Sequence, residues 1–325
     1  MFNRFGTGLL AVFTFVWALP AVAQEVTPAR QILADPSYLP LKGQVFGESD
    51  FLFSAQTGGS FGPAGARTSS ITIDSEVVGQ VFRYGLTDRL SLNLAAEYAW
   101  SRAKSTTIAG DVSHSDVNGF EDPSVGLTYR LIRQFDHPVS VDLTATYAPD
   151  LISADNADAY GGAGSRAFGG SQAQVSLAVA HGESAFTVQA TASIRYVGDR
   201  TVEDLANDDE VRTASYWVPA VSVASRIRLA DRLSANLGAQ YDFEGSPAAY
   251  NQQNGLTFDT NIGNVGSVNV ALNYLFISRR FDGSLIYRHT FDSSVDATYP
   301  ANPAFNSSYD RGGNSIELTF RYTLK

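Results

Sequence analysis

The sequence contains no cysteine, so disulfide bonds cannot stabilise it in an oxidising compartment. Positive charge is scarce: 23 lysine and arginine residues face 33 aspartate and glutamate residues, and the net charge of −10 argues against binding to nucleic acid. The apolar run from Leu9 to Leu19 covers only eleven residues, whereas a membrane-spanning helix needs about 20. No other segment is apolar for longer. These absences exclude a disulfide scaffold, a nucleic-acid binder and a helical membrane protein.

The N-terminus has the three parts of a secretory signal peptide. Arg4 supplies a positive charge, the apolar run follows, and Ala21–Ala23 forms a small-residue cleavage site. We expect residues 1–23 to be a signal peptide that is removed, with an uncleaved anchor as the alternative. The mature chain therefore begins near Gln24 and works outside the cytoplasm.

Residues 24–42 contain prolines and show no periodicity. Such a segment is either a loose periplasmic leader or a partial plug tucked into a pore, and we favour the loose leader. From residue 43 to residue 325 the pattern changes to alternation, and we expect this part to form one barrel.

The alternation is clearest between Arg89 and Ala103. Leu90, Leu92 and Leu94 alternate with serine, asparagine and alanine, and the segment continues into aromatic residues. Because successive side chains of a strand point to opposite faces, one face is apolar and the other is small and polar. A strand that crosses a bilayer needs about 9–11 residues, with lipid on one side and water on the other.

Twelve segments show this pattern, and the joins between them alternate between short and long. The predicted strands are Gln44–Ala55, Ser70–Tyr84, Arg89–Ala103, Asp122–Ile132, Val139–Ala148, Ser171–Ala180, Ala185–Val197, Thr213–Leu229, Arg232–Glu244, Val265–Ile277, Phe281–Asp292 and Ser315–Leu324. Bacterial outer-membrane barrels have an even number of strands, short periplasmic turns and longer external loops. The sequence therefore predicts an all-β fold: a single transmembrane up-and-down antiparallel β-barrel of about 12 strands in the bacterial outer membrane.

Charged side chains on the inner face are the candidate functional residues. The predicted lumen-lining residues are Glu48, Asp50, Asp74, Glu76, Glu97, Arg130, Asp142, Arg195, Arg226, Arg228, Arg288 and Arg321. The acids come mainly from the early strands and the arginines from the later ones, so we expect an electric field across the lumen that tunes selectivity. Alternatively, these charges pair across a narrow lumen and fill it, because twelve strands lie between the packed barrels of about eight and the open channels of about 16–18.

The second predicted strand is irregular. Its alternation slips between Val81 and Phe82. We expect a β-bulge at that point, because one extra residue in a strand would restore the pattern on either side.

Two stretches resemble a known family. Tyr84–Ser91 (YGLTDRLS) and Gly119–Leu127 (GFEDPSVGL) are similar to recurrent motifs of the outer-membrane barrels called MetA-pathway of phenol degradation proteins, although Glu121 replaces an expected glycine. The resemblance covers most of the mature chain. It implies an outer-membrane location and uptake of small molecules, aromatic ones among them. The alternation from Phe320 to Leu324 also resembles the C-terminal signal that outer-membrane assembly machinery reads.

The expected function is passive passage of small, aromatic or weakly apolar solutes. The expected partners are the lipid bilayer, the solute and the assembly machinery; no nucleic acid, cofactor or metal is expected. A structural or adhesive barrel with a closed lumen is the alternative. A lipid hydrolase is less favoured, because it needs a nucleophile beside a base. Of the four histidines only His289 lies well inside a predicted strand, facing lipid, and no serine is marked beside it. We therefore expect no enzyme.

Overall fold

The computed structural model describes residues 33–324, except residues 64, 135, 153–154, 157–162, 165–169, 205–208, 253–254 and 278–279. The predicted signal peptide, residues 1–23, lies outside the described residues. Within the described ranges no helix is both long enough and apolar enough to cross a membrane. The short 3-10 helix η2 (Pro303–Phe305) lies in the connection between the last two strands.

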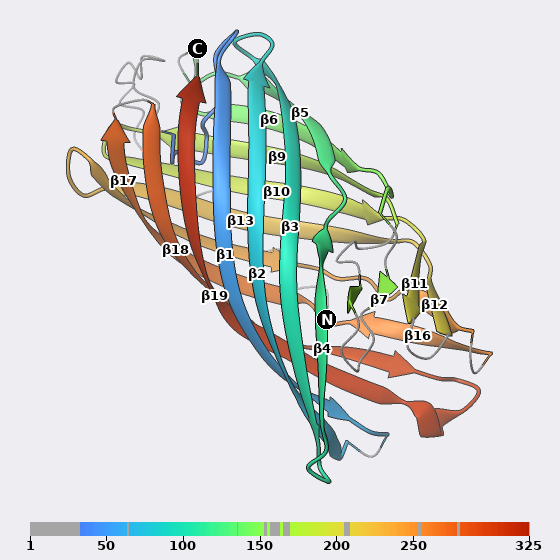
Figure 1. Ribbon diagram of the computed structural model, residues 1–325. Helices are drawn as coiled ribbons and strands as arrows, with labels where there is room; N and C mark the ends of the chain where they lie inside the picture. The colour runs from blue at the N-terminus through green and yellow to red at the C-terminus, as the bar shows by residue number, and fades with distance from the viewer. Residues whose placement is uncertain are drawn as a thin grey trace, which may run out of the picture.

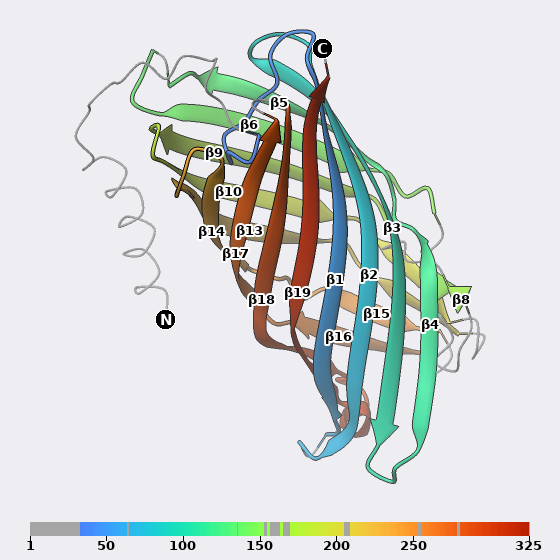
Figure 2. The ribbon, with the colours of Figure 1, turned by 60° about the vertical axis from the view of Figure 1, so that its left-hand side comes forward.

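Twelve antiparallel strands form a closed barrel, as predicted (Figures 1 and 2). In order around the ring they are β1 (Val45–Phe61), β2 (Arg67–Gly85), β3 (Leu90–Thr107), β5 (Ser124–Ile132), β6 (Ser140–Ala148), β9 (Gln172–Gly182), β10 (Phe186–Val197), β13 (Tyr216–Arg228), β14 (Leu233–Asp242), β17 (Val265–Ile277), β18 (Phe281–Thr298) and β19 (Ser307–Leu324). β1 pairs with β2 on one side and with β19 on the other, so none of these twelve strands is an edge strand.

The strands differ greatly in length. β1, β2 and β3 have 17, 19 and 18 residues, and β18 and β19 have 18 each, whereas β5 and β6 have nine. The long strands run past their predicted ends on the side of the long connections. Figure 1 shows them reaching well beyond the short strands. The extra length escaped prediction because a strand that has left the lipid no longer needs an apolar face.

The long connections also contain paired strands where the sequence predicts loops. These are β4 (Val112–Phe120), β7 (Asp155–Asn156), β8 (Ala163–Gly164), β11 (Arg200–Asp204), β12 (Asp209–Thr213), β15 (Ala248–Asn251) and β16 (Leu256–Ile262). β12 pairs with β15, β15 with β16, and β16 with the end of β18, so neighbouring connections are hydrogen-bonded to one another. The barrel wall therefore continues as sheet beyond the belt on the long-connection side.

The outer face carries an apolar belt with an aromatic girdle at each end. Leu94 and Leu272 lie in the belt and are 47% and 51% exposed. Toward the long connections, Tyr98 contacts Trp100 with ring centroids 4.5 Å apart. Toward the short turns, Tyr274 and other rings form a second cluster. Exposed aliphatic side chains between two aromatic bands are the outer surface that a bilayer requires.

The predicted bulge between Val81 and Phe82 is wrong. β2 pairs with β1 and with β3 across this point without a shift in register. Gln80, a polar residue next to this point, faces outward, and its amide is hydrogen-bonded within the wall. Its Oε1 accepts from Ser49 Oγ at 2.7 Å, and its Nε2 donates to the carbonyl of Glu48 at 2.8 Å. A satisfied amide can therefore occupy an outward position that the sequence pattern reserves for apolar residues.

Replacing Leu272 by arginine tests the lipid belt. We expect Leu272→Arg to lower the free energy of unfolding by about 2–4 kcal/mol, because the guanidinium would enter hydrocarbon. Equilibrium unfolding in phospholipid vesicles measures the change. Leu86→Arg, in the turn after β2, is the matched control and should change stability by less than about 0.5 kcal/mol. Equal effects of the two substitutions would contradict the placement of Leu272 in lipid.

Candidate functional site

The segment Leu33–Lys42 fills the barrel mouth at the end that carries the short turns. Leu33 and Leu39 are only 3% and 4% exposed, and Pro40 is among the most deeply buried residues of the described chain. Figure 1 shows this segment inside the top of the barrel. The favoured loose leader is therefore wrong for these ten residues, which we call the plug. Residues 24–32 of the same predicted segment lie outside the described residues.

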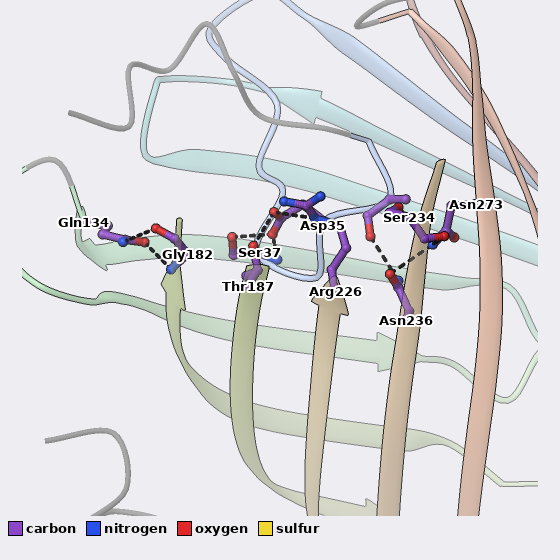
Figure 3. Close-up of polar contacts among 10 residues, drawn as sticks. Asp35, Ser37, Gln134, Gly182, Thr187, Arg226, Ser234, Asn236 and Asn273 are labelled. Carbon is purple, nitrogen blue, oxygen red and sulfur yellow. Dashed lines mark hydrogen bonds and ion pairs between the residues drawn. The ribbon is translucent and has the colours of Figure 1, made fainter. Parts of the chain in front are cut away.

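Asp35 is the main polar anchor of the plug (Figure 3). Its Oδ2 accepts a hydrogen bond from Thr187 Oγ1 on β10 at 2.7 Å and lies 3.3 Å from Arg226 Nε on β13. Its Oδ1 accepts from both the amide and the hydroxyl of Ser37. Arg226 is 3% exposed, so its charge has left bulk water and Asp35 is its counter-ion. Removing one partner of such a pair leaves an uncompensated buried charge.

A second anchor fastens the plug to the wall at β5. Arg130 on β5 makes a bidentate ion pair with Asp142 on β6, at 2.7 and 2.8 Å. Its Nη2 also donates to the carbonyl oxygen of Ser37 at 2.6 Å. Asn236 on β14 donates to the carbonyl of Ala34 at 3.2 Å. The plug is thus hydrogen-bonded to four strands, and Figure 3 shows the contacts with β10, β13 and β14.

The chain leaves the plug through a tight turn into β1. Gly43 has a φ of +78°, which favours glycine. At Gly85, a Cβ atom would lie 2.0 Å from the carbonyl oxygen of Leu41, so only glycine lets the chain pass so closely over the end of β2. Burial raises the pKa of Tyr38 to about 12, although the charge of Arg83 partly opposes this. The phenol therefore stays protonated and donates to Gln44 Oε1 at 3.1 Å.

Ten of the twelve predicted lumen residues occupy inward positions in the strand alternation. They are Glu48, Asp50, Glu97, Arg130, Asp142, Arg195, Arg226, Arg228, Arg288 and Arg321. Asp74 and Glu76 instead face outward, on the same side of β2 as Phe82 and Tyr84. Their predicted position is wrong because it assumed the bulge. Glu76 lies level with Trp100 of the outer girdle, so these two carboxylates lie at the edge of the belt and not in its middle.

The predicted separation of acids from arginines does not hold. Arg321 on β19 makes ion pairs with Glu48 on β1 and with Asp282 on β18, and it donates to Ser284 Oγ at 2.7 Å. Arg130 and Arg226 are paired as described above. Arg321 and Arg130 thus pair with acids on neighbouring strands, and Arg226 pairs with an acid of the plug. The alternative prediction agrees with the structure in the pairing of inward charges, but these pairs lie along the wall and do not cross or fill the lumen.

Arginines nearer the two barrel ends are more exposed. Arg228 pairs with Asp231 at the short turn after β13, at 2.6 Å. Arg195 lies 3.9 Å from Glu244 toward the long connections. Arg288 has no ion pair among the described residues and is exposed to the lumen.

A cavity of about 320 Å³ lies between the plug and the wall. The plug contributes Pro36, Tyr38 and Leu39, which give it an apolar side. The opposite side is made of hydroxyl and amide groups from β3, β5, β6, β9 and β10: Ser91, Asn93, Thr128, Thr144, Thr146, Ser176, Gln189 and Thr191. These hydroxyl and amide groups are neutral, and each can both donate and accept hydrogen bonds. The cavity is therefore amphipathic, with one apolar side and one hydrogen-bonding side.

The sequence analysis missed Asp35, Thr187 and Asn236, which hold the plug to the wall. Asp35 lies in a stretch without periodicity, so no pattern indicated which way it faces. Thr187 and Asn236 are short polar residues on the inner face, where such residues are common, and nothing marks them as contacts of the plug.

The structure offers no support for chemistry at His289. Its Nδ1 is hydrogen-bonded to Asn314 Oδ1 at 2.9 Å, and its ring packs edge-on against Phe291 on the outer face. Among the described residues, no three histidine, aspartate or glutamate side chains are arranged to hold a metal ion.

Removing the carboxylate of Asp35 should loosen the plug. Because the chain has no cysteine, Leu39→Cys introduces a single buried thiol whose modification rate reports opening of the plug. We expect this thiol to react about tenfold faster, or more, when Asp35→Ala is added, since Arg226 then loses its counter-charge. The measurement is the labelling rate with a water-soluble thiol reagent in lipid vesicles.

Asp231→Ala, which removes an exposed ion pair at the short-turn end, is the control and should leave the labelling rate unchanged. Equal labelling rates with and without the Asp35 substitution would contradict the anchoring role of this carboxylate.

Comparisons with known proteins agree with the architecture. No protein-family model matches the sequence, and no curated protein is similar to it. Among solved structures, an outer-membrane channel from Pseudomonas putida aligns with a TM-score of 0.60 and 15% identity, over 89% of this chain and 99% of that one. The transport unit of the autotransporter AIDA-I from Escherichia coli aligns with a TM-score of 0.52 and 9% identity, over 95% and 96% of the two chains. Identities this low show a shared fold. With its closed ring and its apolar belt, the chain is an outer-membrane β-barrel.

Proposed function

We propose that the chain is a selective outer-membrane channel for passive passage of small molecules, aromatic or weakly apolar ones among them. The observation that carries the proposal is the amphipathic cavity between the plug and the inner wall. The barrel interior is therefore not filled by its own side chains, as a purely structural barrel would be. Short turns would face the periplasm and long connections the exterior, and the lipid bilayer and the assembly machinery would be its partners.

The plug favours a gated channel over a permanently open pore. It lies across the mouth through which a solute would leave, and polar contacts from four strands hold it there. Such contacts can be exchanged for contacts with water at modest net cost, because a typical hydrogen bond contributes only about 0.5–1.5 kcal/mol. The proposed passage is therefore gated, with the plug shifting to let a solute through.

The lining of the cavity favours solutes that are partly apolar. Tyr38, Leu39 and Val81 offer ring and aliphatic surface, and the hydroxyl wall opposite can satisfy one or two polar groups. A structural or adhesive barrel remains the second candidate, and it requires a lumen that admits no solute even when the plug is displaced.

Flux through reconstituted protein tests the proposal. The wild type in liposomes should take up benzyl alcohol several-fold faster than empty liposomes. Replacing residues 33–40 by a glycine–serine linker of equal length should raise both this uptake and the single-channel conductance in planar bilayers, because the mouth is then open. Uptake at the level of empty liposomes from both proteins would contradict a channel and favour the closed structural barrel.

A further inference from the structure

Arg83 is a charged group in the cavity that the wall does not neutralise. It lies on the inner face of β2 and lines the cavity. Its guanidinium carbon is 5.1 Å from the centroid of the Phe46 ring, and Phe46 is itself 1% exposed. Among the described residues, no carboxylate forms an ion pair with Arg83. Its hydrogen-bond donors therefore remain available to a molecule in the cavity.

The other charge of the cavity is already satisfied. Asp142 is the one acidic residue of the described lining, and both of its oxygens are held by Arg130, at 2.7 and 2.8 Å. The remaining lining groups are neutral. The cavity therefore carries one positive charge without a counter-ion, and one negative charge on a ligand would balance it.

The neutral groups limit what else the ligand can be. Next to Arg83, the plug presents the ring of Tyr38 and the side chain of Leu39. The opposite hydroxyl groups partly bond to each other, as Thr128 and Thr144 do at 3.0 Å, so they demand few hydrogen bonds from a ligand. A volume of about 320 Å³ is near the lower end of the usual range for ligand sites, about 300–1,000 Å³. The occupant is thus small, largely apolar and singly charged.

The geometry points to a binding site for a small aromatic carboxylate, with the carboxylate on Arg83 and the ring beside Tyr38 and Leu39. A planar guanidinium matches a carboxylate through two parallel hydrogen bonds. A phosphate ester, with more charge, would need a second cation that the described lining lacks. This inference rests on the proposed function and names the solute class that the channel would select.

Equilibrium binding tests the site without relying on transport. The mature protein in lipid nanodiscs is titrated calorimetrically with benzoate and with benzyl alcohol, which share the ring but differ in charge. We expect benzoate to bind about tenfold more tightly to the wild type, since hydrogen bonds between charged groups are stronger than those between neutral groups. Arg83→Gln should abolish this preference. Arg232→Gln, which removes an exposed arginine from the short turn after β13, should keep it.

Each result decides the inference. Equal affinities for benzoate and benzyl alcohol in the wild type would overturn it, as would a preference that survives Arg83→Gln. If Arg83→Gln does not fold, Arg83→Lys replaces it: that variant keeps the charge but loses the planar fork, and it should retain only part of the preference. An unchanged preference in Arg83→Lys would overturn the bidentate contact. Liposome uptake of benzyl alcohol is read separately, so the channel can stand while the carboxylate site fails.

Discussion

The pairing of every backbone amide and carbonyl within the lipid is the constraint on which the rest of this molecule depends. Hydrocarbon offers no partner to these groups, so a sheet can cross it only as a ring. The pairing of β1 with β19 closes that ring. Closure separates an outer face that must be apolar from an inner face that can be polar. The inner face can then hold the buried ion pair of Arg226 and Asp35, which no lipid-facing surface would tolerate.

The polar interior explains how one short segment can both close the mouth and shape a cavity. The plug is fastened by its backbone carbonyls and by Asp35, and this leaves Tyr38 and Leu39 facing the space beyond. A molecule in the cavity would therefore contact the same segment that blocks its exit. Binding and opening would share residues, and a solute that displaces Tyr38 would also strain the anchor at Asp35, three residues before it.

The ring could be predicted from sequence, because lipid imposes a two-residue period on every strand that crosses it. β17 even has its predicted bounds, Val265–Ile277. The same rule misled at β2, where a bulge was predicted between Val81 and Phe82 and Asp74 and Glu76 were placed on the wrong face. There Gln80 faces outward with its hydrogen bonds satisfied. For residues 24–42 the sequence offered a plug only as the alternative to a loose leader, since this segment crosses no lipid and has no period that could decide between the two. The extra strands beyond the belt were missed for the same reason.

The hairpin of β3 and β4 continues its hydrogen-bonded ladder beyond the belt to a tip at Gly110, where φ is +90°. A hairpin with such regular pairing is stiff, and its tip makes few contacts with the rest of the fold. A foreign peptide spliced in at this tip would sit at the end of a hydrogen-bonded hairpin, beyond the apolar belt. The same insertion halfway along the hairpin would interrupt the ladder. Hairpin tips are thus the natural places to insert foreign peptides into this barrel.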